Sequence, residues 1–483
     1  MHDAPQPGGR RSWWLREALA VEPPTAQLPP LRGTVRADVA IVGGGYTGLW
    51  SAWFLNQLAP DLRVVVLEQD ICGGGPSGRN GGFVLGAWDD LPALVELYGI
   101  DGGLAVARAF AAAVDAIGEW CGATGVDAEY RKGGYLQVST TPTHDRSWDV
   151  ALETCVRLGA AGELVALSAD EVRARSASPR FRGGVLMNAG ATIQPAKLAR
   201  GLRRVLLQRG VEIHEGTTVT GIDLALHLPG TPGRPVEVVL RTPAGEVRAA
   251  QAILGLNAWA AGWPWFRRHV LPWSSYIVLT EPIPDRLAEL GWTGGESIVD
   301  ARFTLHYFRT TADGRIAFGA GAGRAGFDGR IGASFTADHD AAGRAARGLR
   351  YLYPQLDDVA LVDAWGGPID ITDDHFPYFG SLLAGRVHFG HGYAGNGVSQ
   401  AYVGGRILAG LALRLDDDHT RLPLVGRRPR GFPPEPLRFV GARLMREVIL
   451  WKEEAEQRGG RAPWPIRELA RLPRRMGYHL GPR

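Results

Sequence analysis

Residues Asp38-Val-Ala-Ile-Val42, followed at once by Gly43-Gly-Gly45-Tyr-Thr-Gly48, decide the fold. The first five form a short, β-branched apolar run typical of a buried parallel strand. The next six fit the pattern G-x-G-x-x-G. A helical pattern covers residues 49–58, and a second apolar run ends in Glu68, 20 residues after Gly48. Strand, glycines, helix, strand and acid in this order predict a nucleotide-binding βαβ unit.

The glycines of this unit have separate physical roles. Gly43 makes the tight turn, Gly45 lets a pyrophosphate approach the backbone, and Gly48 permits close packing of helix on strand. The helix N-terminus supplies N–H groups without partners. Glu68 can accept hydrogen bonds from both ribose hydroxyls, which disfavours NADP and leaves NAD and FAD open. The predicted contacts here are Gly43, Gly45, Tyr46, Thr47, Gly48, Glu68 and Gln69.

A second glycine-dense loop, Gly73-Gly-Gly-Pro-Ser77-Gly-Arg79-Asn80-Gly81-Gly82, favours FAD. It follows the second strand, where its backbone amides can approach another part of a long ligand. A flavin lying further along the crevice needs such a loop, and NAD does not. A flexible linker would gain nothing from Arg79 and Asn80. The predicted flavin-side contacts are Ser77, Gly78, Arg79, Asn80, Gly81 and Gly82.

With these two loops, the sequence resembles the FAD-dependent D-amino-acid oxidase/glycine oxidase superfamily, and within it the gamma-glutamylputrescine oxidase-like proteins. Three later segments extend the resemblance: a helix followed by strands up to residue 219, a returning strand at 251–257, and a glycine-rich loop at 388–398 that opens a helix over 399–413. In the family the residue matching Val219 contacts adenine through its backbone, and the last loop cradles the flavin ring. The resemblance implies cofactor contacts at Val219, Asn257, Gly392, Gly395, Asn396, Gly397 and Val398.

The resemblance also bears on how the flavin is attached. Some relatives bond it to a His near the first flavin loop, and others to a Cys before the last one. Residues 77–82 contain no His, and residues 365–377 contain no Cys. Dissociable FAD is therefore expected, with His375 left open as an attachment point.

These segments predict an α/β chain (α+β overall): a Rossmann-like FAD-binding domain, a discontinuous antiparallel-sheet substrate domain and a C-terminal helical arm. Strand patterns near 272–280, 304–309 and 315–319 and an amphipathic helix over 104–120 place the substrate domain. The expected divisions are 1–36 as an N-terminal lead; 37–90, 188–262 and 350–416 as the FAD-binding domain; 91–187 and 263–349 as the substrate domain; and 417–483 as the arm.

The implied reaction transfers hydride from the C–N carbon of an amine or amino acid to flavin N5, giving an imine that hydrolyses. Arg309 is a candidate clamp for a substrate carboxylate, or else an ordinary sheet-surface arginine. Tyr276 and Tyr307 are candidate pocket hydroxyls that could equally be core. No lysine occurs in these segments, although some relatives use one for the reaction with oxygen, so the electron acceptor is O2 or unknown. The proposed catalytic residues are His391, Tyr393, Arg309, Tyr307 and Tyr276.

Composition narrows the function further. The chain has 483 residues, with 53 Lys+Arg against 50 Asp+Glu, so a nucleic-acid partner held by basic excess is not expected. Three cysteines without a C-x-x-C pair predict no disulfide framework and no metal site, and favour the cytoplasm. The apolar stretch 39–55 is interpreted as strand, turn and helix rather than a membrane span.

Two other functions stay open. One is an FAD-dependent dehydrogenase of the same fold acting on a hydroxy acid or glycerol phosphate. The other is a non-catalytic flavoprotein interaction module that works through the arm. In the arm, a helix near 436–457 is expected to pack back on the body, with a homodimer contact as an alternative.

Overall fold

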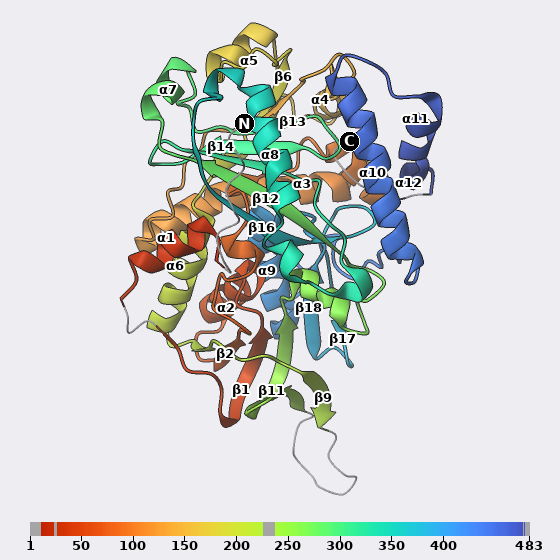
Figure 1. Cartoon of the computed structure of the whole chain (residues 1–483). Coiled ribbons are helices and arrows are strands. Elements are labelled where there is room, and N and C mark those ends of the chain that lie inside the picture. The colour runs from red at the N-terminus through yellow and green to blue at the C-terminus, as the bar shows by residue number, and fades with distance from the viewer. Residues whose placement is uncertain (1–10, 24–26, 226–236, 477, 479–483) are drawn as a thin grey trace, which may run out of the picture.

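The computed structural model describes residues 11–23, 27–225, 237–476 and 478, and shows two large sheets side by side (Figure 1). The first sheet has the order β17-β18-β11-β1-β2-β8, extended by β10 and β9 beside β11. Its strands β1, β2, β8, β11 and β18 run parallel, and β17, β10 and β9 run antiparallel to their neighbours. The strands are β1 (Gly33–Val42), β2 (Val64–Leu67), β8 (Glu212–His214), β9 (Gly221–Ala225), β10 (Glu237–Thr242), β11 (Gly245–Leu254), β17 (Tyr378–Leu382) and β18 (Val387–His391).

The predicted βαβ unit is present at the centre of this sheet. Strand β1 is exposed at its start and buried over its last four residues, which pair with β2 on one side and β11 on the other. Between β1 and β2 runs α2 (Tyr46–Leu58), which begins where the glycine run ends. An apolar run flanked by parallel partners on both edges is buried on both faces, as its sequence pattern indicates.

Helices cover the first sheet. Helix α6 starts sharply because the Gln194 side chain accepts a hydrogen bond from the backbone N–H of Lys197 at 2.8 Å and Pro195 occupies the first turn. Helix α3 bends at Gly99, whose φ is 73°. These helices are α3 (Leu91–Thr124), α6 (Pro195–Gln208) and α9 (Gly397–Leu413).

The second sheet has the order β16-β12-β15-β14-β13-β4-β6-β5 and is antiparallel except where β13 meets β4. Helix α8 (His339–Leu352) lies across β12 and β15, with Asp338 capping its N-terminus. The strands are β4 (Tyr135–Val138), β5 (Leu164–Leu167), β6 (Gly184–Met187), β12 (Leu271–Thr280), β13 (Ser297–Asp300), β14 (His306–Thr310), β15 (Ile316–Ala320) and β16 (Leu361–Ile371). A separate pair joins β3 (Phe83–Leu85) to β7 (Gly190–Thr192).

One expected division needs correction. The segment 350–416 was assigned as a whole to the FAD-binding domain, but β16 pairs along its length with β12 of the second sheet. Only β17, β18 and α9 of that segment belong with the first sheet. Because β16 leads from one sheet into the other, the two sheets share a continuous stretch of chain.

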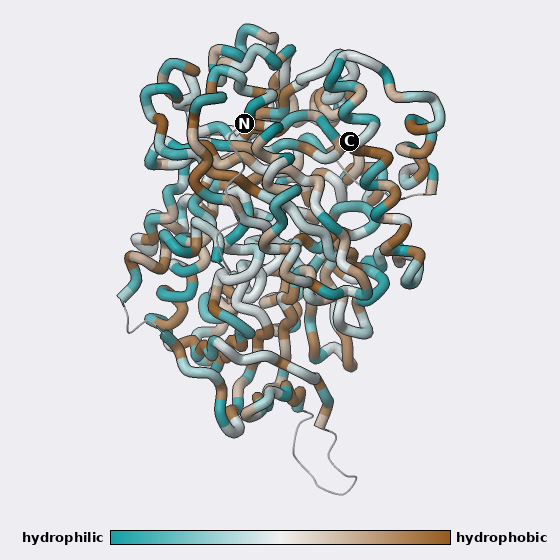
Figure 2. Tube along the Cα trace, in the orientation of Figure 1, coloured by the Kyte–Doolittle hydropathy of each residue, from teal (hydrophilic) through white to brown (hydrophobic). Residues whose placement is uncertain are grey.

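The two ends of the described chain both pack on the body. Helix α1 (Trp13–Ala20) buries Trp14 against Trp365, with ring centroids 5.4 Å apart. The arm contains α10 (Leu437–Gln457), α11 (Trp464–Ala470) and α12 (Leu472–Arg475), and α10 runs along the side of the molecule in Figure 1. Figure 2 shows hydrophobic and hydrophilic residues alternating along α10, as expected for a helix with one face on the body. Residues 1–10 of the predicted lead and 479–483 of the predicted arm lie outside the described residues.

The α/β fold class with a Rossmann-like unit is therefore confirmed. No helix within the described ranges is long and apolar enough to cross a membrane. The remaining helices are α4 (Asp149–Arg157), α5 (Ala169–Arg175) and α7 (Pro284–Glu289).

Candidate functional site

A cavity of about 820 Å³ opens at the carboxyl ends of β1 and β2. This is the edge at which open α/β sheets bind their ligands. Most of the predicted cofactor residues line it, although they come from four separate parts of the chain. They are Gly43, Gly45, Tyr46, Thr47, Glu68, Gln69, Ser77, Arg79, Asn80, Val219, Asn257, Gly395, Gly397 and Val398.

The glycine turn has the close contacts that a dinucleotide-binding turn requires. A Cβ at Gly48 would lie 1.9 Å from the carbonyl oxygen of Gly43, so any side chain there would push α2 away from β1. Gly43 has a φ of 110°. Gly45 caps α2 and faces the cavity, and the Tyr46 N–H that follows it donates to the Ser77 Oγ at 2.9 Å, so this helix N-terminus and the second glycine loop meet at the cavity.

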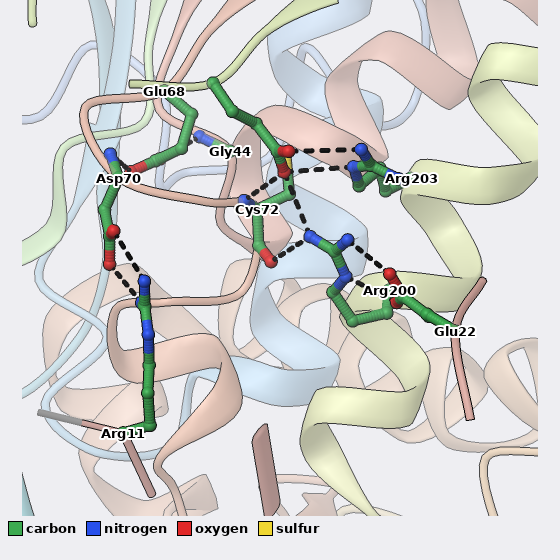
Figure 3. Close-up of polar contacts among 9 residues, drawn as sticks. Arg11, Glu22, Gly44, Glu68, Asp70, Cys72, Arg200 and Arg203 are labelled. Atoms are coloured by element: carbon green, nitrogen blue, oxygen red, sulfur yellow. Dashed lines mark hydrogen bonds and ion pairs between the residues drawn. The ribbon is translucent and has the colours of Figure 1, made fainter. Parts of the chain in front are cut away.

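Glu68 ends β2 at the rim of the cavity. Its carboxylate accepts hydrogen bonds from the backbone N–H of Gly44 at 2.7 Å and of Asp70 at 2.9 Å (Figure 3). Burial raises the pKa of Glu68 to about 7. The carboxylate thus ties the glycine turn to the following loop while lining the cavity.

An ion-pair network supports the loop after Glu68. Asp70 pairs with Arg11, and Arg200 joins Cys72 and Glu22 (Figure 3). Buried Glu215 accepts hydrogen bonds from the Cys72 backbone N–H at 2.8 Å and from Arg200 at 2.9 Å. The sequence offered no signal for this network, because its members are isolated charges far apart along the chain.

The loop 76–80 separates this cavity from a second one. The Arg79 guanidinium donates to the carbonyls of Gly74 at 3.0 Å and Gly366 at 3.2 Å, and burial lowers its pKa to about 10. Asn80 donates to the Pro76 carbonyl at 3.0 Å. Residues lining both cavities are Pro76, Arg79, Asn80, Pro368, Ile369 and Gly395. The two cavities are therefore neighbours across a shared wall.

The second cavity has a volume of about 320 Å³ and lies between the flavin-side loops and the second sheet. Two adjacent carboxylates, Asp89 and Asp90, lie in a wall that is otherwise largely apolar. Burial and the charge of Asp90 raise the pKa of Asp89. Its apolar lining includes Phe83, Leu85, Leu271, Trp273, Val299, Phe303, Leu305, Ile369, Ile371, Phe376, Met445 and Ile449.

Two of the five proposed catalytic residues lie at these cavities. Tyr307 lines the second cavity, and its hydroxyl lies 2.7 Å from the Ser275 Oγ. Burial raises the pKa of Tyr307 to about 12. Tyr393 lines the first cavity and its hydroxyl accepts from the Thr47 Oγ1 at 2.9 Å.

Arg309, the predicted clamp for a substrate carboxylate, contacts the protein backbone instead. Arg309 lines neither cavity. Its guanidinium donates to the carbonyls of Gly81 at 2.7 Å, Ile193 at 2.6 Å and Thr310 at 3.0 Å, and it lies 4.9 Å from the ring centroid of Trp14. Its nitrogens are thus occupied by the backbone, and it fastens the flavin-side loop to the second sheet.

The other two catalytic candidates also lie outside both cavities. Tyr276 points to the opposite face of β12 and packs against Gly366. His391 is enclosed by the rings of Phe266 and Phe389, at centroid distances of 4.2 and 5.2 Å, and burial lowers its pKa to about 3. The glycine loop beside His391 predicts a contact with the ring, and the strand position of Tyr276 predicts either a pocket hydroxyl or a core residue; because alternate strand residues face opposite ways, neither side chain lines a cavity.

Six predicted cofactor residues lie outside the first cavity. Gly81 and Asn396 line the second cavity instead. The other four shape loops: a Cβ at Gly78 would lie 2.2 Å from the Gly73 carbonyl, and the Gly392 N–H donates to Asp370 at 2.7 Å. The residues lining neither cavity are Gly48, Gly78, Gly82 and Gly392.

Several first-cavity residues were missed. Asp370 at the end of β16 lines the cavity, and burial raises its pKa to about 7. Residues 331, 332 and 336 come from the segment expected to belong to the substrate domain. The pair Gly366-Gly367, shortly before Asp370 in the sequence, could have indicated that this strand passes close to the cavity. A Cβ at Gly367 would lie 3.1 Å from Arg79, so glycine there lets the loop 76–80 approach the strand.

The described residues fit a flavin dinucleotide. The Asn257 Oδ1 is buried at the first cavity with no hydrogen-bond partner among them. All three lysines lie in the described part of the chain and none lines either cavity. Within the same residues, no cluster of three His, Cys, Asp or Glu could hold a metal ion.

Comparisons with known proteins agree with this geometry. The family model for FAD dependent oxidoreductases matches residues 38–411. A probable oxidoreductase OrdL of Rhizobium meliloti is 32% identical over 413 residues, which cover 83% of this chain and 88% of that protein. The gamma-glutamylputrescine oxidoreductase of Escherichia coli is 29% identical, over 80% of this chain and 86% of that protein. Glycine oxidase from Geobacillus kaustophilus has a similar fold, with a TM-score of 0.62 at 21% identity, over 82% of this chain and 100% of that one.

A dinucleotide-sized cavity on a βαβ unit, a second glycine loop beside it and the family match together lead to one conclusion: the chain belongs to the family of FAD-dependent oxidoreductases.

Proposed function

We propose that the protein oxidises an amine or amino acid at the carbon bonded to nitrogen. The supporting observation is the second cavity, which adjoins the FAD cavity through shared walls, is largely apolar and carries the carboxylates Asp89 and Asp90. Carboxylates there favour a substrate with a positively charged nitrogen over an anionic one. Two relatives, named gamma-glutamylputrescine oxidoreductase and glycine oxidase, agree with this substrate class.

The residues divide the work of holding FAD and substrate. Of the residues that line the first cavity, Glu68 would hold the ribose, the α2 N-terminus at Gly45 would hold the pyrophosphate, and the loops 76–80 and 395–398 would hold the ring. When bound, FAD would accept hydride from the carbon next to a nitrogen that has first lost its proton to water, and the resulting imine would hydrolyse. Apolar walls around Phe83, Trp273 and Leu305 exclude water from the reacting groups and orient the substrate.

The alternative substrates fit this cavity less well. A hydroxy acid or glycerol phosphate needs cationic groups that are available to its anion. The arginines of the lining are Arg79 and Arg446, and both donate to backbone carbonyls, Arg446 to Gly323 at 2.6 Å.

Anaerobic flavin bleaching tests the proposal. The purified holoprotein is mixed with alkylamines of two to eight carbons, amino acids, hydroxy acids and glycerol 3-phosphate, and the flavin absorbance is followed. We expect bleaching by amines or amino acids alone. Bleaching by the hydroxy acids or glycerol phosphate alone would assign the alternative reaction, and no bleaching by any compound would favour a non-catalytic interaction module.

Four finer points remain predictions. Admitting air after bleaching distinguishes O2 from another electron acceptor. Acid precipitation should release the flavin into the supernatant if it is not covalently bound, which also tests His375. Light scattering tests a homodimer through the arm, where Leu437, Leu444 and Trp451 are exposed; the cytoplasmic location also stays a prediction.

A further inference from the structure

One wall of the second cavity comes from the C-terminal arm. Helix α10 contributes Ala442, Met445, Arg446 and Ile449 to the lining. Their spacing of three, one and three residues puts all four side chains on one helical face. The family match ends at residue 411, so this wall belongs to a segment outside the matched residues.

The arm is fastened to the part of the second sheet that lines the same cavity. Buried Glu453 accepts hydrogen bonds from the Thr304 backbone N–H at 3.0 Å and from Arg302 at 3.2 Å. Residues 303–305 are themselves cavity lining. The contact therefore sets the distance between α10 and the opposite wall.

A second fastening, by Arg446 and Arg438, lies about two and four turns nearer the N-terminus of α10. The Arg446 guanidinium donates to the carbonyls of Gly323 at 2.6 Å and Ala322 at 3.2 Å. Buried Arg438 donates to the Arg267 carbonyl at 2.6 Å. With anchors on both sides of Met445, and Ile449 between Arg446 and Glu453, the apolar side chains of α10 are held in place.

We propose that Met445 and Ile449 determine substrate specificity by contacting the part of the amine that lies away from the reacting carbon. This rests on the proposed function. A cavity of about 320 Å³ beyond the FAD site is larger than a two-carbon amine requires. An apolar helix face at its edge suits an aliphatic chain, since burying each methylene is favourable. The substrate class is an extended amine rather than a glycine-sized one.

Substitutions that fill or enlarge the cavity test the assignment. Met445→Trp should lower kcat/KM about 10-fold or more for the longest alkylamine that bleaches the wild-type flavin, and change it less than about 2-fold for the shortest. Ile449→Ala should shift the preferred chain length upward by one or two carbons. The matched control is Leu444→Trp on the same helix, where the side chain is 62% exposed and both amines should react as in the wild type.

A labelling experiment gives a readout that does not depend on turnover. The three native cysteines are buried. In a Met445→Cys variant, the new thiol should react with iodoacetamide several-fold more slowly when a long alkylamine is present, and at an unchanged rate with a short one.

The outcomes separate the two proposals. If no amine bleaches the wild-type flavin, the proposed function fails. A different result would contradict the role of the arm. In that case amines bleach the flavin, but Met445→Trp lowers kcat/KM equally for long and short amines or changes it for neither, and Ile449→Ala leaves the preferred chain length unchanged. Flavin content close to one per chain in each variant shows that it has folded.

Discussion

The two cavities are built in different ways. The first is formed largely by glycine-rich backbone from separate parts of the chain, such as 43–48 and 73–80, each opening onto a helix or loop. The second is formed by side chains from strands of the second sheet, from β3 and from α10. A cavity lined by backbone changes shape only when the chain itself is rearranged, whereas a cavity lined by side chains changes shape with each single substitution. The first cavity is thus suited to a constant ligand and the second to a variable one.

The largest effect is expected at the backbone cavity. Gly45→Val puts a branched side chain within about 3 Å of the Ser77 Oγ, where the pyrophosphate must approach. We expect FAD affinity to fall roughly 100-fold or more, since such overpacking typically costs about 1–3 kcal/mol and here also blocks the ligand. Flavin content after gel filtration measures it. Gly221→Val, in open space on β9, is the control; a fully yellow Gly45→Val protein would contradict the assignment of this turn.

Arg309→Met tests whether Arg309 stabilises the fold or binds the substrate. Removing the guanidinium leaves the carbonyls of Gly81 and Ile193 without their donor, which should lower the free energy of unfolding by roughly 2–4 kcal/mol. Urea unfolding measures the loss, and exposed Arg241→Met should cost about 0–1 kcal/mol. If Arg309→Met leaves the free energy of unfolding unchanged and raises KM for amino acids alone, Arg309 binds the substrate carboxylate.

Glu68→Ala should weaken FAD binding by about 1–3 kcal/mol, because the Gly44 and Asp70 N–H groups and the ribose hydroxyls lose an acceptor. Titration of flavin-depleted protein with FAD gives the dissociation constant. Glu68→Gln retains one acceptor oxygen and should lose less. Equal FAD affinities in the wild type, Glu68→Ala and Glu68→Gln would show that Glu68 does not bind the cofactor.

The smallest effect concerns the side-chain cavity and depends on pH. The folded protein raises the pKa of Asp89, so this group favours the folded state at low pH. That contribution is fully present below about pH 4 and is lost as the pH rises through the raised pKa. Asp89→Asn removes the titration, so its Tm should exceed that of the wild type by a few °C at pH 9 and match it near pH 4.

The control for this pH dependence is Asp170→Asn, at a carboxylate whose side chain is 92% exposed. Its Tm difference from the wild type should be the same at both pH values. A parallel pH profile for Asp89→Asn and the wild type would show that folding leaves the pKa of Asp89 unchanged.

The contrast between the cavities also explains what the sequence could predict. The first cavity is formed by motifs that are local in the chain, so the sequence predicts the glycines of its two loops, Glu68 and Ser77 as lining residues. The second depends on which face of each strand turns inward. Ser275 lines the cavity and Tyr276, one residue later, does not; Tyr307 does, whereas its neighbour His306 pairs with Asp300 on the other side. A shift of one residue reverses every side chain, and no local pattern fixes it.

Long-range contacts account for the other differences. In the sequence Arg309 follows His306-Tyr307-Phe, a place from which it could bind a substrate carboxylate, but its partners Gly81 and Ile193 are more than 100 residues away along the chain. The pairing of β16 with β12 was missed for the same reason.

The placement of α10 has an evolutionary consequence. Helix α10 lies outside the family-matched residues 38–411 and lines the second cavity but not the first. Substitutions in α10 can therefore reshape the second cavity while the residues that line the first stay unchanged.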